Sequence, residues 1–271
     1  MKPNSQLIIG AVTGVIIVLM SAVSFVWVPH DYNEINHNIR LTSPGVNHIF
    51  GTDNLGRDVF SRIMAGGRNS LLLAICTVAA AAAAGCLLGL LTGYSGGIAG
   101  EIIMRIIDTL SSFPGIVLAL LMVAVLDNSS FSLFFALFIL FIPSYTRVMR
   151  TGAMQYKNSS FIQAEKILGA SFFRITFIHI LPNLAPSLLS ASVIGLSNAI
   201  LAESVMSYLG MGIQPPNPSW GRMLSESQAW FFNAPWCVFA PGLCIMLTVI
   251  SFHLLGEGIK RSMGGQYGSL A

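Results

Sequence analysis

Charged residues are scarce in this sequence of 271 residues, of which Asp, Glu, Lys and Arg together make up 9%. About a quarter is usual in soluble domains. Hydrophobic residues make up 54% of the chain, and a soluble fold of this size could not bury so much apolar surface. The formal net charge of +3 is also too small to indicate binding to nucleic acid. The composition therefore predicts a membrane protein.

The sequence also lacks the signs of a catalytic centre. It contains no GxxxxGK[ST] loop, through which many proteins hold ATP phosphates. His253 lies in an apolar run and could pair with a serine inside the membrane, but no local motif supports this. The four cysteines lie in apolar stretches without CxxC spacing, which argues against a zinc site or disulfides. We expect no catalytic residue and no cofactor in this chain.

Three histidines, His30, His37 and His48, fall in a polar segment that extends from Pro29 to Ser70. Their spacing matches no compact pattern of metal ligands. We interpret them as solvated loop residues and expect no metal site.

Six apolar runs are each about as long as the 20 residues that a helix needs to cross a bilayer. A helix satisfies its own backbone hydrogen bonds in lipid, and the runs do not alternate as barrel strands do. The predicted fold class is all-α, with six transmembrane helices. The runs are Leu7–Val28, Leu71–Tyr94, Ile102–Leu126, Phe131–Val148, Leu184–Leu209 and Ala234–Leu255. The first has no small-residue cleavage site, so we expect a retained span and not a signal peptide.

These runs divide the chain into three parts. Residues 1–70 hold the first span and the polar segment, residues 71–258 form the transmembrane core, and residues 259–271 form a tail. The core contains one long basic loop, Arg147 to Pro182.

The basic residues predict an orientation. Six spans would place both termini and the long loop on one side, and positive charge marks the cytoplasmic side. The basic residues on that side are Lys2, Arg147, Arg150, Lys157, Lys166, Arg174, Lys260 and Arg261. The polar segment would then be external, although it contains four arginines that oppose this bias: Arg40, Arg57, Arg62 and Arg68.

Small residues crowd the second run. Ala79 to Gly85 reads AAAAAAG, and Gly89 and Gly93 follow at helical spacing. Small side chains let helices approach closely in lipid, so the pattern favours a tightly packed bundle; the alternative is a merely permissive apolar span.

Charges inside membrane spans are costly and suggest function. Arg105 and Asp108 are three residues apart, so we expect an ion pair on one helix face. Glu203 has no partner within its own run, and either lines a water-filled path or forms a hydrogen bond inside the bundle.

The long loop has helical spacing. Gln155 to Leu168 predicts a helix whose apolar face holds Phe161, Ala164, Ile167 and Leu168. Gly169 can supply the left-handed residue that ends it, and Phe172 to Ile180 predicts a second helix. Such a knob either folds back on the bundle or fills a groove in a partner.

The stretch FIQAEKILGASFFRITFIHILPNLAPSLL, Phe161 to Leu189, resembles the coupling loop of permease subunits of ATP-binding-cassette importers. Gln163 stands where that family has a glutamate, Ala164 matches its first alanine, and Glu165 takes the place of its second. Gly169 is the family's glycine. The two departures put in question an ionic role for the first position.

Three further stretches are similar to the peptide/nickel branch of these permeases. They are HIFGTDNLGRDVFSRIMAGGRNSL (His48–Leu71), RIIDTLSSFPGIVLAL (Arg105–Leu120) and ESVMSYLGMGIQPPNPSWGRML (Glu203–Leu224). Together the four stretches are distributed along most of the chain after the first run.

The resemblance implies the second permease of an importer in the bacterial cytoplasmic membrane. Its partners would be a different permease, two ATP-binding subunits that bind ATP and Mg²⁺, and an external substrate-binding protein. The implied ATPase-coupling residues are Gln163, Ala164, Glu165, Lys166, Leu168 and Gly169. The implied external motif comprises Gly51, Thr52, Asp53, Gly56, Arg57 and Asp58.

The resemblance also implies alternating access driven by ATP, with a cargo of peptides, nickel or a nickel chelate, or glutathione-like compounds. Asp108 and Glu203 would belong to the translocation path or to polar contacts inside the bundle. The alternative is a secondary transporter driven by an ion gradient, in which one of these two carboxylates relays protons or sodium.

Overall fold

The computed structural model describes residues 5–126 and 128–264. Lys2 and the last seven residues of the expected tail lie outside this range. Nine α-helices are present in the described residues: α1 (Ser5–Val23), α2 (Val59–Tyr94), α3 (Gly97–Ser112), α4 (Gly115–Leu126), α5 (Ser130–Lys157), α6 (Ser160–Ile167), α7 (Leu181–Tyr208), α8 (Trp220–Ser227) and α9 (Trp236–Gly264). Two short 3-10 helices, η1 (His37–Ile39) and η3 (Gln228–Trp230), and a π-helix, η2 (Arg174–Ile180), complete them. The all-α prediction is confirmed for these residues.

Four helical segments are long and apolar enough to cross a membrane: α2, α5, α9 and the continuous helix formed by η2 and α7. The pair α3 and α4 makes a fifth if both count as one broken span. The described apolar part of α1, Leu7–Val23, is shorter than these. The structure thus shows four to five candidate spans by length and composition, and the sixth stays a prediction.

The expected continuous run from Ile102 to Leu126 is wrong. Helices α3 and α4 meet at an angle of 93°. Pro114 lies at the break, and the residue before it, Phe113, is extended with φ −80° and ψ 142°. A proline lacks the N–H that a helix needs and excludes the helical conformation from the preceding residue, which explains the bend.

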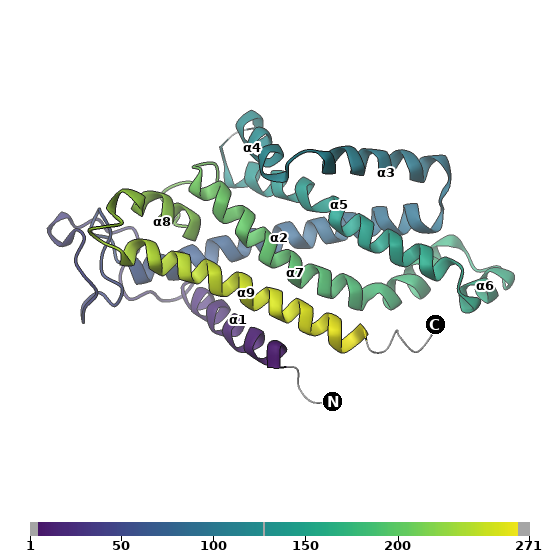
Figure 1. The fold of residues 1–271 in the computed structure, drawn as a ribbon, viewed down its shortest axis with the longest axis horizontal. Helices are drawn as coiled ribbons and strands as arrows, with labels where there is room; N and C mark the ends of the chain where they lie inside the picture. Colours follow the sequence, from purple (N-terminus) through teal and green to yellow (C-terminus); the bar gives the residue numbers. More distant parts are fainter. Residues whose placement is uncertain (1–4, 127, 265–271) are drawn as a thin grey trace.

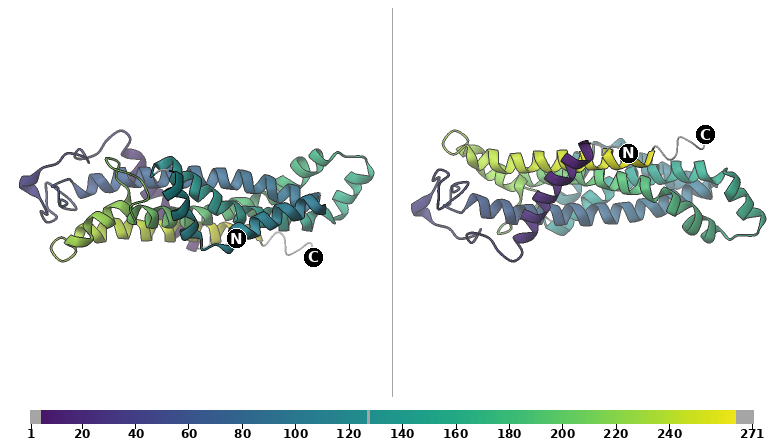
Figure 2. Two further views of the ribbon diagram at one scale, coloured as in Figure 1. Left: turned by 90° about the horizontal axis from the view of Figure 1, so that it is seen from above. Right: turned by 90° about the horizontal axis from the view of Figure 1, so that it is seen from below.

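Helix α2 forms the centre of an elongated bundle (Figures 1 and 2). Its 36 residues are about 54 Å long at 1.5 Å per residue, well beyond the roughly 30 Å of a hydrocarbon core. The helix begins at Val59, twelve residues before the predicted start, because its first turns carry polar residues that hydropathy does not count as span. The polar segment, whose irregular part ends at Asp58, extends beyond one end of the bundle, and α6 lies at the other (Figure 1).

The small residues of α2 bring it close to α5, as predicted. A Cβ atom built on Gly89 would lie 2.6 Å from both Met149 Cβ and Thr146 O of α5, closer than real Cβ atoms come. Gly85 and Gly93, one turn to either side, meet α5 in the same way. Lipid supplies little hydrophobic drive for helix association, so this close backbone contact is what holds the two helices together.

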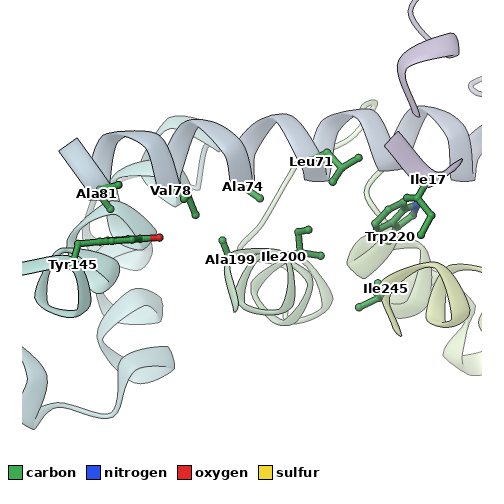
Figure 3. Close-up of a cluster of buried hydrophobic side chains, with 11 residues drawn as sticks. Ile17, Leu71, Ala74, Val78, Ala81, Tyr145, Ala199, Ile200, Trp220 and Ile245 are labelled. Carbon is green, nitrogen blue, oxygen red and sulfur yellow. The ribbon is translucent and has the colours of Figure 1, made fainter. Parts of the chain in front are cut away.

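The main core cluster lies along α2, where five other helices converge (Figure 3). It includes Ile17 of α1, Tyr145 of α5, Ile200 of α7, Trp220 of α8 and Ile245 of α9. Trp220 is fully buried, and its indole N–H donates to the carbonyl of Ile63 at 3.0 Å. Helix α8, which the sequence analysis did not assign, is thereby fastened to the start of α2.

The long loop differs in part from its prediction. The expected helix from Gln155 to Leu168 is interrupted, because α5 continues to Lys157 and α6 starts afresh at Ser160. Gly169 has φ +79°, so the predicted left-handed turn is confirmed. The second helix begins at Phe172 as predicted, but runs through η2 into α7 without ending near Pro182.

Candidate functional site

The α6 tip, here residues 158–173, has one fully buried apolar side chain, which anchors it. Ile162 is fully buried in a cluster that includes Met149 and Ala153 of α5, Ile175 and Ile180 of η2, and Leu184 of α7. A buried isoleucine contributes about 1.5–3 kcal/mol, so this contact keeps α6 attached to the ends of α5 and α7. A force on the tip would therefore be transmitted to two of the long helices.

The far side of the α6 tip exposes large apolar side chains. Ile167 is 86% exposed and Leu168 is 81% exposed, and Phe161 and Phe173 are also exposed. These include three of the four residues of the predicted apolar face, and the fourth, Ala164, is exposed as well. Of the two outcomes left open for this knob, folding back is not what Ile167 and Leu168 do. Ile162, outside the predicted face, packs on the bundle, and Ala170 and Phe172 of the same tip also contact it.

The polar residues of the predicted coupling set hold the tip in shape. Gln163 is exposed, and its side-chain amide donates to the carbonyl of Lys157 at 3.1 Å. A carboxylate oxygen of Glu165 lies 3.5 Å from His179 Nε2, and the Lys166 ammonium lies 5.3 Å from the ring centroid of Tyr94. Gln163 thus has a local role that needs no charge.

The predicted external motif forms a tight knot at the other end of the molecule. Asp53 Oδ1 accepts from the backbone N–H groups of Leu55 and Arg57, at 2.8 and 2.9 Å. Gly56 has φ +78°, and a Cβ there would overlap the carbonyl of Asn36. Asp58 caps α2 by accepting from the backbone N–H of Ser61 at 2.7 Å.

The remaining two motif residues join the knot to neighbouring elements. The Thr52 hydroxyl donates to the carbonyl of Ile39, and its own carbonyl accepts from the indole of Trp236 at 3.3 Å. Gly51 lies against the carbonyl of Thr42 and against that same indole.

A cluster of five charges, of which Asp53 and Arg62 are buried and the others partly buried, connects the motif to α8 and is called here the charge network. Arg57 donates to Asp53 Oδ2 at 2.6 Å and to Glu226 Oε2 at 2.9 Å. Arg62 also donates to Glu226 Oε2, at 3.1 Å, and Arg222 donates to its other oxygen at 3.2 Å. Arg222 and Glu226 were not among the predicted site residues, although their spacing of four residues is that of a helical ion pair.

The arginines that oppose the positive-inside bias all have local partners in the structure. Arg57 and Arg62 belong to the charge network. Arg40 donates to the carbonyl of Asn54 at 2.6 Å, and Arg68 donates to the carbonyl of Ser24 and lies 5.0 Å from the ring centroid of Phe25. These arginines have structural roles at this end of the molecule.

The histidines of the polar segment are not all solvated, which corrects the prediction. His48 Nδ1 lies 2.9 Å from Asp58 Oδ1, and the side chain of His48 is only 16% exposed. Its ring centroid lies 4.7 Å from that of His30. His30 is 18 residues from His48 and 28 from Asp58 in the sequence. The three come together because the segment folds back on the start of α2, which sequence spacing could not show.

The predicted pair of Arg105 and Asp108 is also wrong. Asp108 accepts from Arg147 of α5 at 2.9 Å, and Arg105 is exposed without an ion pair to any described residue. Helix α3 packs beside α5, so the basic side chain of the neighbouring helix reaches Asp108. Both side chains of this pair are at least half exposed.

Glu203 lies inside the packed bundle and is fully buried. The hydroxyl of Ser207 donates to it at 2.6 Å and accepts from the backbone N–H of Ile213 at 3.1 Å. Of the two alternatives for Glu203, this geometry favours a hydrogen bond inside the bundle, at the end of α7. It does not favour a position on a water-filled path.

A groove of about 380 Å³ lies between α5 and α7 and has mixed polarity. Its polar lining comprises Ser144, Tyr145, Ser187, Ser190, Asn198 and Lys260, and its apolar lining includes Phe141, Val148 and Ile194. Such a mixture suits a ligand with a polar backbone and variable side chains.

Comparisons with known proteins extend over nearly the whole chain. The model of a family described as binding-protein-dependent transport system inner membrane component matches residues 85–265. The dipeptide transport system permease protein of Alkalihalophilus pseudofirmus is 38% identical over 264 residues, covering 97% of this chain and 86% of that protein. The probable D,D-dipeptide transport system permease protein of Escherichia coli is 36% identical, covering 96% and 88%. The glutathione transport system permease protein of Pectobacterium atrosepticum is 36% identical, covering 94% and 86%.

Proposed function

This chain belongs to the family of binding-protein-dependent transport system inner membrane components, and we propose that it carries a short peptide across the membrane. It is a multi-pass permease subunit of an ATP-driven importer. Two of the relatives named above are dipeptide permeases and one is a glutathione permease, so their cargoes share peptide chemistry. They favour a peptide over nickel as the cargo, and an importer over an ion-driven secondary transporter.

The observation that carries the coupling mechanism is the exposed apolar face of the α6 tip. Ile167 and Leu168 are highly exposed at the end of α6, which lies at the end of the bundle opposite the polar segment (Figure 1). An ATP-binding subunit with an apolar groove would bury this face in the helix-in-groove mode. Ile162 then passes the movement of that subunit to α5 and α7.

The proposed assembly contains a second permease subunit, two ATP-binding subunits and an external substrate-binding protein. ATP and Mg²⁺ bind to the ATP-binding partners, because this sequence has no phosphate-binding loop. The proposal keeps the division of the chain into three parts. Residues 1–70 hold the first span and the polar segment, residues 71–258 form the transmembrane core, and residues 259–271 form the tail.

The proposed topology counts α1 and the α3–α4 pair as spans, which makes six and places both termini in the cytoplasm with the α6 tip. The start of α1 and the end of α9 both point toward the half of the bundle that holds α6 (Figure 1). The polar segment is then external and faces the substrate-binding protein.

We assign the translocation path to the groove between α5 and α7. Its volume of about 380 Å³ suits a short peptide, and Asn198 and the serines can pair with peptide N–H and C=O groups. Asp108 and Glu203 do not line this groove.

The test is a double variant, Ile167→Ser with Leu168→Ser, in the complete transporter reconstituted in proteoliposomes. Burying an isoleucine or leucine contributes about 1.5–3 kcal/mol each, so docking of the ATP-binding subunit should weaken by at least about 100-fold. We expect the ATP-binding subunits to be lost on purification and ATP-driven dipeptide uptake to fall accordingly.

The matched control is Val46→Ser. Val46 is fully exposed at the opposite end of the molecule, and its loss should leave docking of the ATP-binding subunits unchanged. Normal docking and uptake in the double variant would refute the role of the α6 tip. Uptake that survives ATP depletion and stops when the ion gradient is removed would instead support the secondary transporter.

A further inference from the structure

We propose that the polar segment binds a divalent transition-metal ion of the zinc type through His30, His48 and Asp58. One ligand atom from each of these residues lies within 4.8 Å of the other two. The three come from different parts of the segment, which folds back to bring them together at Asp58, the residue that caps the start of α2. The site is remote from the α6 tip and from the groove between α5 and α7, and does not depend on the transport function.

The pair His48 and Asp58 already has nearly the separation of two ligands on one ion. His48 Nδ1 lies 2.9 Å from Asp58 Oδ1. Zinc bonds of about 2.0–2.2 Å in a tetrahedron place neighbouring ligand atoms roughly 3.3–3.5 Å apart. An ion can therefore replace the proton between these atoms with a small outward movement, while Asp58 Oδ2 keeps its capping bond to Ser61.

His30 is held so that one ring nitrogen is available as a ligand. His30 Nε2 lies 2.9 Å from the carbonyl oxygen of Asn47, which can only accept, so Nε2 carries the proton. The other nitrogen, Nδ1, then keeps its lone pair. A backbone carbonyl on the second nitrogen is the usual outer partner of a histidine that binds a metal, since it sets the ring orientation and tautomer.

The surroundings attract a cation. The cluster lines a cavity of about 170 Å³, which roughly equals the volume of five or six waters in the liquid. Asp31 and Glu34 also line it, no Lys or Arg does, and Glu34 forms no ion pair with a described residue. Three carboxylates thus face the cavity, and water or one of the two further carboxylates can complete the coordination.

The donor set determines the class of ion. Two imidazoles and a carboxylate suit zinc and its neighbours, whereas calcium and magnesium require mainly oxygen ligands. A bound ion would link residues 30, 48 and 58 and fasten the polar segment to the start of α2.

The test measures zinc binding to the intact transporter in detergent, purified through a tag without histidine. We expect His30→Ala to remove one bound zinc per copy of this chain, or to weaken that binding by at least about tenfold. With cobalt as the probe, the visible absorption of a nitrogen- and oxygen-bound ion should fall in parallel. His37→Ala is the control, because His37 lies in the same segment but outside the cluster.

Two variants separate metal binding from folding. Among the residues that the structure describes, the His30 side chain hydrogen-bonds only to Asn47, and it is exposed, so His30→Ala leaves the cap of α2 intact. Asp58→Asn removes the charge but keeps an oxygen for the N–H of Ser61, and should also weaken zinc binding. Zinc binding in His30→Ala equal to that of the wild type and of His37→Ala would overturn the proposal, and leave the pair His48–Asp58 as a structural hydrogen bond.

Discussion

The charge network gives the sharpest prediction on stability, through the change Glu226→Gln. Glu226 accepts from Arg57, Arg62 and Arg222, and the side chain of Arg62 is only 3% exposed. Removing one partner of a buried ion pair typically costs about 3–5 kcal/mol. Glu226 itself is 24% exposed, and Arg62 keeps Asp53 at 3.6 Å, so we expect a smaller loss of about 2–3 kcal/mol.

The comparison is with Asp108→Asn, the same change of a carboxylate to an amide at an exposed site. Asp108 pairs with Arg147 at 2.9 Å, but the two side chains are 62% and 50% exposed. Such an open pair is only weakly stabilising, so its loss should cost about 0–1 kcal/mol. The two variants make the same chemical change, but they differ in burial and in the number of arginines that contact the carboxylate, three at Glu226 and one at Asp108.

The assay is unfolding of the purified chain in mixed micelles by a denaturing detergent, followed by tryptophan fluorescence. Two of the four tryptophans, Trp220 and Trp236, hydrogen-bond at the end of the molecule that holds the charge network. We expect Glu226→Gln to lower the free energy of unfolding by at least about 1 kcal/mol more than Asp108→Asn does. Equal losses would refute the reasoning that burial makes this network stabilising.

Three further predictions follow from the helix contacts, the tip and the groove. Gly89→Ala should cost about 1–3 kcal/mol in the same unfolding assay because the methyl group meets α5 at 2.6 Å, whereas Gly14→Ala, with 3.5 Å of clearance, should cost little; similar losses would contradict close packing. Gly169→Arg should abolish transport while the chain still inserts, because φ +79° strains any other residue, and ATPase activity that stays coupled to uptake would contradict a lever at the tip. Asn198→Leu should lower dipeptide uptake at least about tenfold while the ATP-binding subunits stay attached, because a hydrogen bond to the peptide is lost in the path. Unchanged uptake would place the path elsewhere.

Helix bounds were predictable where hydropathy or a local conformational preference determines them. The runs that became α5, α7 and α9 were found from apolar composition, although their ends differed by several residues. The turn at Gly169 was found because glycine favours positive φ whatever surrounds it. The start of α2 was missed by twelve residues because Arg62 and Arg68 lie within it, and their burial depends on partners elsewhere in the chain.

The α6 tip shows what hydrophobic periodicity cannot determine within a single helix. The apolar face of Phe161, Ala164, Ile167 and Leu168 was identified correctly as a face, but periodicity alone did not show that it is exposed and that Ile162 is the anchor. Both sides of this short helix carry apolar residues. Only the positions of η2 and α7 show which side packs on the bundle.

Composition and hydropathy were enough to predict an all-α membrane protein, and the motifs along the chain indicated the permease family. Hydropathy and short motifs are set by residues that are close together in the sequence, so a single sequence is enough to identify them. The tertiary structure decided which charges pair: Asp108 with Arg147 of α5 and not with Arg105, and Arg57 with Glu226, 169 residues away. It also decided that His30 and His48 meet at Asp58, because distance in a fold is set by how helices and loops pack and not by separation along the chain.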